Sequence, residues 1–173
     1  MAIVRSYDGK TPQIGDGVFL AETAAVIGDV IIGDGSSVWY GSVVRGDVMP
    51  IRIGAHTSIQ DNTVVHVTSH VSGTVVGDRV TVGHNVILHA CTVEDECIIG
   101  MGSILLDGVR VGRHCIVGAG ALVTPGTNVP EGSMVLGSPA RVKRPLSDDE
   151  RARIAGNAEH YVELARRYLA GER

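Results

Sequence analysis

The sequence predicts a mainly β fold in which short parallel strands coil into a β-helix, with one α-helix packed alongside it. Three observations support this: an aliphatic residue recurs every six positions, glycine often follows it, and aromatic residues are scarce. The 173 residues are 44% hydrophobic but only 3% aromatic, and 23 of them are glycine. A core of normal size must therefore be filled by small aliphatic side chains, which is typical of a narrow, repetitive fold.

The six-residue repeat has twenty positions, with three extra residues after Val44, five after Val65 and one shortened step before Val93. All twenty are Ile, Leu or Val: Ile14, Leu20, Val26, Ile32, Val38, Val44, Ile53, Ile59, Val65, Val76, Val82, Leu88, Val93, Ile99, Leu105, Val111, Val117, Val123, Val129 and Val135. Because glycine tolerates the left-handed and crowded backbone of sharp corners, each unit predicts a short strand and a corner. Three units close a triangular coil, and coils stacked about 4.8 Å apart bury the aliphatic positions. Residues 1–145 are predicted to form this domain.

The pattern changes after Pro145. Ser147 and Glu150 have the spacing of a capping box, which begins a helix. Apolar residues then recur with helical periodicity at Ile154, Ala158, Tyr161, Ala165 and Tyr168. The sequence therefore predicts an amphipathic helix over 148–170, within a C-terminal segment 146–173 that packs against the outside of the β-helix.

Charge and cysteine content exclude several classes of protein. With 15 Lys and Arg against 19 Asp and Glu, the net charge is −4, and no basic run favours nucleic acid or an anionic membrane as a partner. The sequence shows neither a membrane-spanning stretch nor a signal peptide, so we expect a cytoplasmic protein. The cysteines form no CxxC pair. Counting repeats predicts that Cys97 and Cys115 stack one coil apart and point inward as small apolar side chains.

Three of the seven histidines interrupt the repeat in a pattern that indicates metal binding. His66 directly follows Val65, and His89 directly follows Leu88, three repeats later. The two imidazoles are therefore expected on adjacent coils, close enough to share a metal with Zn–N bonds of about 2.0–2.1 Å. His84 stands on the preceding face, in a column with Asp61, so in a three-fold oligomer His84 of a neighbouring chain would complete the site.

Three motifs resemble those of the gamma-class carbonic anhydrases, hexapeptide-repeat proteins with a left-handed β-helix. They are Arg45-Gly46-Asp47, QDNTVVH at 60–66 and GHNVILH at 83–89. The resemblance implies a homotrimer with one Zn²⁺, Fe²⁺ or Co²⁺ at each subunit interface, held by His66 and His89 of one chain and His84 of the next. It also implies a lyase that reversibly hydrates CO2 to bicarbonate with a metal-bound hydroxide.

The resemblance also assigns roles to residues around the metal. Arg45 and Asp47 resemble the interface ion pair of the family. Gln60 resembles the residue that hydrogen-bonds the metal-bound water or bicarbonate, and Asp61 resembles the acceptor that orients a metal-binding histidine. Tyr161, on the C-terminal helix, is expected either to approach the site or to pack in the core.

The sequence also departs from the family pattern. Val48 and the segment 67–73 stand where the best-characterised branch carries proton-transferring glutamates, and His70 is the only side chain of that segment that ordinarily titrates near neutral pH. Two alternatives therefore stay open: a metal-binding homologue with a thioesterase or non-catalytic role, and a hexapeptide acyltransferase. The tail at 137–141 is common to both transferases and anhydrases, so it does not discriminate between them.

Overall fold

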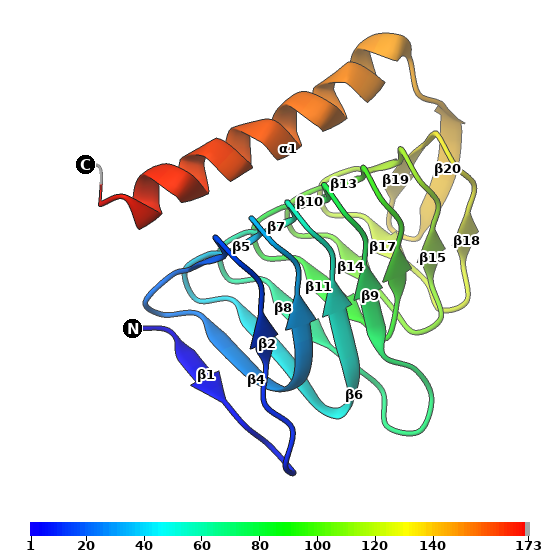
Figure 1. Ribbon diagram of the computed structural model, residues 1–173. Helices are drawn as coiled ribbons and strands as arrows, with labels where there is room; N and C mark the ends of the chain where they lie inside the picture. Colours follow the sequence, from blue (N-terminus) through cyan, green and yellow to red (C-terminus); the bar gives the residue numbers. More distant parts are fainter. Residues whose placement is uncertain (172–173) are drawn as a thin grey trace.

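A computed structural model describes residues 1–171, so the last two residues of the predicted segment 146–173 lie outside the described part of the chain. Within that part, twenty strands and one helix follow each other (Figure 1). All pairings between coils are parallel, and the prediction of a parallel β-helix is confirmed. The coil has three faces.

The strands divide among the three faces as follows. The first face contains β8 (Val64–His66), β11 (Ile87–His89), β14 (Ile104–Leu105) and β17 (Leu122–Val123). The second face contains β9 (Thr74–Val76), β12 (Thr92–Val93), β15 (Arg110–Val111) and β18 (Asn128–Val129). The third face contains β3 (Phe19–Leu20), β5 (Ser37–Val38), β7 (Ser58–Ile59), β10 (Thr81–Val82), β13 (Ile98–Ile99), β16 (Ile116–Val117), β19 (Ser133–Gly137) and β20 (Ala140–Pro145).

Two long strands join the first and second faces into one sheet. β6 (Val43–Ile53) pairs with β8 at one end and with β9 at the other, and β4 (Ala25–Ile32) runs beside it. The N-terminal strands β1 (Ile3–Arg5) and β2 (Gln13–Ile14) pair with β4. The opposite end of the coil closes with the antiparallel pair β19 and β20.

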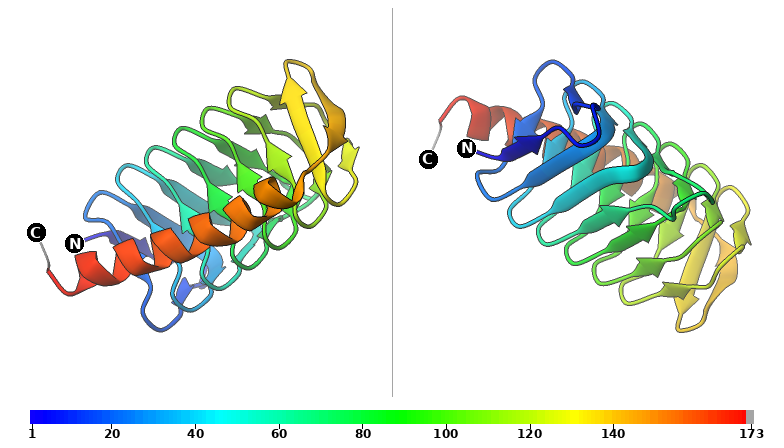
Figure 2. Two further views of the ribbon diagram at one scale, coloured as in Figure 1. Left: turned by 90° about the horizontal axis from the view of Figure 1, so that it is seen from above. Right: turned by 90° about the horizontal axis from the view of Figure 1, so that it is seen from below.

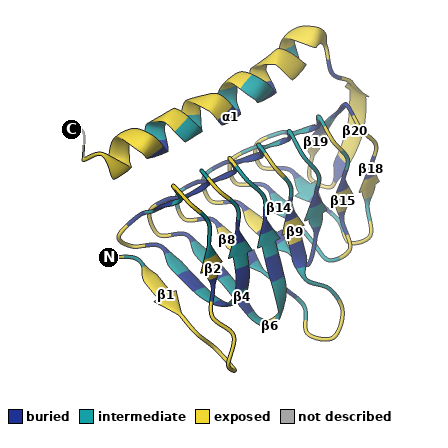
Figure 3. Cartoon of the chain, in the orientation of Figure 1, coloured by how far each residue is buried: buried dark blue, intermediate teal, exposed yellow. Residues whose placement is uncertain are grey.

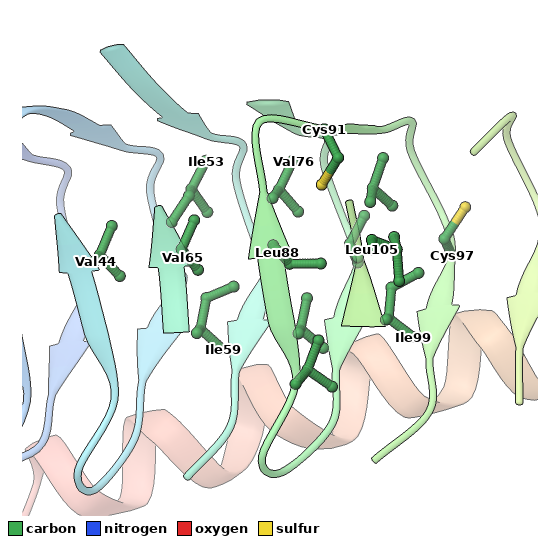
Figure 4. Packing of buried hydrophobic residues seen from close by; sticks show 14 of the residues in the cluster. Val44, Ile53, Ile59, Val65, Val76, Leu88, Cys91, Cys97, Ile99 and Leu105 are labelled. Carbon is green, nitrogen blue, oxygen red and sulfur yellow. The ribbon is translucent and has the colours of Figure 1, made fainter. Parts of the chain in front are cut away.

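The register repeats every three units, as the spacing predicts. Leu88 pairs with Val65 on one side and with Leu105 on the other, and such side chains line up in a single row inside the coil (Figure 4). Eighteen of the twenty repeat positions are buried. Ile14 and Leu20 are half-buried because they belong to the first coil, which has no complete coil beneath it.

The glycines that follow the aliphatic positions serve close packing and not a left-handed backbone. A Cβ on Gly33 would lie 2.6 Å from the nitrogen of Ala55, and one on Gly100 would lie 2.5 Å from the nitrogen of Ala119. The left-handed residues come two positions later, as at His56 with a φ of 55°. The expected glycine corners are therefore sites of close approach between coils, and the turn itself follows them.

The inward stacking of Cys97 and Cys115 is confirmed. Both are fully buried, and the backbone nitrogen of Cys115 donates to the sulfur of Cys97 at 3.4 Å. Each thiol also donates to a backbone carbonyl, of Gly112 and Pro130 respectively. The two thiols thus satisfy polar backbone groups within the core.

Helix α1 (Asp148–Leu169) begins and packs as predicted, and ends one residue earlier. Ser147 and Glu150 form the capping box, with the Ser147 nitrogen donating to the Glu150 carboxylate at 2.9 Å. The helix runs along the third face and contacts β3, β5, β7 and β10 (Figure 2). Its buried residues are Ile154, Ala158 and Ala165, and its outer side is exposed (Figure 3). No helix among residues 1–171 has the length and apolar character needed to cross a membrane.

The two isoleucines of β13 offer a matched test of this core. Ile99 is fully buried, whereas Ile98 on the outer side of the same strand is half-buried. Ile99→Ala should lower the free energy of unfolding by about 2–5 kcal/mol, and Ile98→Ala by less, because only the first leaves a cavity between coils. Urea denaturation followed by circular dichroism measures both. Equal losses would contradict the assignment of inward and outward positions.

Candidate metal centre

His66 and His89 lie side by side where β8 and β11 end. The two residues pair in register on adjacent coils. Nδ1 of His66 lies 3.3 Å from Nε2 of His89, and the ring centroids are 5.3 Å apart. Register alone therefore brings two imidazole nitrogens together, as the repeat count predicts.

The spacing of these nitrogens fits a shared metal ion. Two nitrogens bound tetrahedrally at about 2.0–2.1 Å stand about 3.3 Å apart, and the observed separation is 3.3 Å. Imidazole ligands suit Zn²⁺, Fe²⁺ and Co²⁺ alike. The donor set thus fits a divalent transition metal without selecting one.

Each imidazole of the pair also contacts a carboxylate through its other nitrogen. Oδ1 of Asp47 lies 3.1 Å from Nε2 of His66, and Oδ1 of Asp107 lies 2.7 Å from Nδ1 of His89. Asp47 further pairs with Arg45 of the same chain. Carboxylates in this position orient metal-binding histidines and raise their basicity.

Both carboxylates are stabilised in their charged form. Burial disfavours ionisation of Asp47, but hydrogen bonds from His66 and Arg45 outweigh it and hold the pKa of Asp47 below its ordinary value. Hydrogen bonds from Thr68 and His89 lower the pKa of Asp107. The pair of imidazoles is therefore flanked by negative charge, which favours a bound cation.

Asp107 and Thr68 are not among the residues that the sequence analysis singled out. Leu105 stacks on Leu88, so Leu106 takes the register position of His89 on the next coil, and Asp107 stands one residue further along. The repeat count therefore gave no signal for Asp107. Thr68 belongs to the five-residue insertion after Val65, where the period gives no register.

His84 occupies a different corner of the coil, which we call the His84 corner and define by Gln60, Asp61 and His84. Nδ1 of His84 lies 2.8 Å from Oδ2 of Asp61, as the shared column predicts. Within residues 1–171, no group of three His, Cys, Asp or Glu side chains is placed to hold a metal. One chain therefore brings together His66 and His89 but not His84.

Tyr161 of α1 lies at the His84 corner and also packs on the core. Its ring meets the ring of Trp39 edge-on with centroids 6.1 Å apart. Burial and the nearby Asp61 raise the pKa of Tyr161, while a hydrogen bond with Gln60 opposes them. Gln60 itself is buried, at 4% exposure. Tyr161 thus approaches the His84 corner and packs in the core at the same time, because this corner lies against α1.

His70 lies apart from the imidazole pair at the tip of the segment 67–73. It lines an open cavity of about 580 Å³ together with Asp47, Val48 and Tyr7. Asp47 thus has one oxygen toward His66 and also borders the same cavity as His70.

Comparisons with known proteins agree with the hexapeptide repeat. Residues 11–46 and 90–125 match the family described as bacterial transferase hexapeptide (six repeats), and residues 50–90 match the hexapeptide repeat of succinyl-transferase. The chain is 44% identical over 168 residues to a carbonic anhydrase of Geobacillus kaustophilus, covering 97% of this chain and 92% of that protein. The chain belongs to the gamma carbonic anhydrase family.

Other members of the gamma carbonic anhydrase family are longer. The chain is 50% identical over 161 residues to gamma carbonic anhydrase 2, mitochondrial, of Arabidopsis thaliana, covering 90% of this chain and 58% of that protein. It thus spans about three fifths of the plant relatives. Among solved structures, a hexapeptide transferase family protein from Anaplasma phagocytophilum has a TM-score of 0.92 and 42% identity, covering 96% of this chain and 98% of that one.

We predict that the purified protein contains about one divalent metal ion per chain. His89→Ala should abolish binding because it removes one of the two facing imidazoles. His114→Ala is the matched control, since His114 is held between Glu96 and Glu131 on another corner. Elemental analysis by mass spectrometry measures the metal. Metal retained by His89→Ala, or lost from His114→Ala, would contradict this assignment.

Proposed function

We propose that the protein catalyses the reversible hydration of CO2 to bicarbonate at a metal centre formed by His66, His89 and His84 of a neighbouring subunit. The observation that carries the proposal is the in-register imidazole pair, 3.3 Å apart, with a carboxylate behind each ring. Membership of the gamma carbonic anhydrase family supports the same chemistry. Three imidazoles would leave a fourth position open, which is the arrangement of a catalytic zinc site.

The shape of the coil supports a homotrimer. The first face is bordered on one side by the His84 corner and on the other by His66 and His89, because the turn that carries His84 leads directly into β11, which ends at His89. A three-fold axis in front of this face would place the His84 corner of each chain beside the imidazole pair of the next.

The outer side of the first face has the apolar character that such an interface needs. Val64 and Ile87 are 40% and 37% exposed, and Ile104 and Leu122 continue the row as half-buried side chains. A contiguous row of partly exposed aliphatic residues is typical of a surface that a partner covers. The trimer would bury this row around its axis.

In the proposed mechanism the protein positions the ligands and the substrate. A divalent metal ion bound by the imidazoles would lower the pKa of a water molecule so that it becomes a nucleophile at neutral pH. Asp61 accepts from His84, and Asp47, held by Arg45, contacts His66, so each ring keeps its orientation. Gln60, supported by Tyr161, would hydrogen-bond the water or bicarbonate oxygen. His70, which lines the same cavity as Asp47, would carry the proton to buffer.

The remaining expectations about this chain stay predictions. CO2 and bicarbonate are the proposed substrate and product, and we propose neither nucleic acid nor membrane as a partner. We propose a cytoplasmic location, as the sequence predicts, whereas the plant relatives are named as mitochondrial. Zn²⁺ is the proposed ion, and Fe²⁺ or Co²⁺ could replace it because imidazole ligands suit all three.

We predict that the metal-loaded protein hydrates CO2, that chelation removes the activity and that added Zn²⁺ or Fe²⁺ restores it. Gln60→Ala should lower kcat/KM about 10-fold to 100-fold, the effect of one hydrogen bond to a charged group. Gln13→Ala, an exposed glutamine on β2, is the control. Stopped-flow measurement of CO2 hydration, with zinc and with iron under anaerobic conditions, tests these predictions. Turnover of acyl-CoA in place of CO2 would support the transferase alternative.

We also predict that the wild-type protein sediments as a trimer. Ile87→Glu should give metal-free monomers, because it places a charge at the proposed axis. Val75→Glu is the control: Val75 is similarly exposed, at 44%, but lies on the second face. Analytical ultracentrifugation with metal analysis tests both. A monomeric wild type would contradict the shared site.

A further inference from the structure

Asp107 uses both oxygens of its carboxylate at the metal centre. Oδ1 lies 2.7 Å from Nδ1 of His89, and Oδ2 accepts a hydrogen bond from the Thr68 hydroxyl at 2.6 Å. The Thr68 hydroxyl is also 3.4 Å from Nδ1 of His89, which is too long to compete. Asp107, and not Thr68, is therefore the hydrogen-bond partner of Nδ1 of His89.

The backbone holds Asp107 and Thr68 in place from separate parts of the chain. The carbonyl oxygen of Asp107 accepts from Gly126 of the next coil at 2.9 Å. Thr68 is fixed within its own segment, where its nitrogen donates to the carbonyl of Ser72 at 3.2 Å. A residue of the coil and a residue of the insertion thus meet at His89.

We propose that Asp107, held by Thr68, is a positioning residue that keeps His89 protonated on Nδ1, so that Nε2 presents its lone pair to the metal. A carboxylate can only accept, so the imidazole nitrogen that faces it must carry the proton. In a neutral imidazole the other nitrogen is then the ligand atom. Nε2 is also the nitrogen that faces His66. This inference rests on the proposed metal centre.

The Thr68 hydroxyl determines which oxygen remains for His89. Because it occupies Oδ2, the carboxylate cannot rotate without breaking a 2.6 Å hydrogen bond, and Oδ1 stays aimed at the ring. The same bond anchors the segment 67–73 beside the imidazole pair. Asp47 has the corresponding place at His66, but there Arg45 occupies the second oxygen.

Titration of the metal-free protein with Zn²⁺ against a competing chelator tests the proposal. Asp107→Ala should weaken the affinity about 10-fold to 100-fold, as expected when a carboxylate behind a metal-binding histidine is lost. Thr68→Val should weaken it less, and Thr68→Ser should retain it because the hydroxyl remains. Glu131→Ala is the matched control, since it removes a carboxylate from His114, which is not a proposed ligand.

Nitrogen-15 NMR of the metal-free protein supplies a readout that needs no metal. His89 should be protonated on Nδ1 in the wild type and in Thr68→Ser, and should become a mixture of tautomers in Asp107→Ala. Unchanged tautomer and affinity in Asp107→Ala would overturn the proposal. A wild type that shows the Nδ1–H tautomer but binds no metal would instead contradict the proposed function, and the metal-directed role of Asp107 with it.

Discussion

The whole structure depends on the coils stacking in register through a parallel backbone ladder. The nitrogen of Gly33 donates to the carbonyl of Ile53, and that of Gly54 donates to Val76, both at 2.8 Å. Because every coil repeats the path of the last, residues one coil apart lie directly on each other. Aliphatic positions then form one continuous core. Two histidines in the same position become neighbours for the same reason.

Buried hydroxyls extend this order into the His84 corner. Ser42 donates to the carbonyl of Gln60 at 2.6 Å, and Thr63 donates to the carbonyl of Gly83 at 2.8 Å. Each hydroxyl also accepts a hydrogen bond from a backbone nitrogen of the next coil. The nitrogen of Thr63 donates to the Ser42 hydroxyl, and the nitrogen of Val86 donates to the Thr63 hydroxyl. The carbonyls of Gln60 and of Gly83, which precedes His84, are thereby bonded inside the core. Side chains projecting from so rigid a backbone are well suited to hold a defined geometry.

Repeat counting predicted the parts of the molecule where the period is unbroken. It placed His89 on His66 because register in a coil follows from the number of units between two residues. It did not predict the contact between Thr68 and Asp107, because residues of an insertion have no register. The position of Thr68 depends on how the segment 67–73 folds back. It also located the left-handed corners two residues early, since glycine after an aliphatic residue reflects crowding between coils. The capping box needed only local sequence, and Ser147 is where the spacing places it.

The division of the histidines between two corners has a thermodynamic consequence for the proposed site. Two imidazoles of one chain can bind a metal ion only weakly compared with three, so the third ligand adds affinity that exists only in the assembled state. By linkage, the metal must then stabilise the trimer by the same free energy with which the trimer favours the metal. The exposed row at Val64 and Ile87 would contribute apolar burial between subunits, but it would not fix how the subunits are rotated relative to one another. The metal contributes orientation, because only one rotation brings His84 of one subunit against the imidazole pair of another. Apolar burial and metal binding would thus have separate roles, one in holding the subunits together and the other in selecting how they meet.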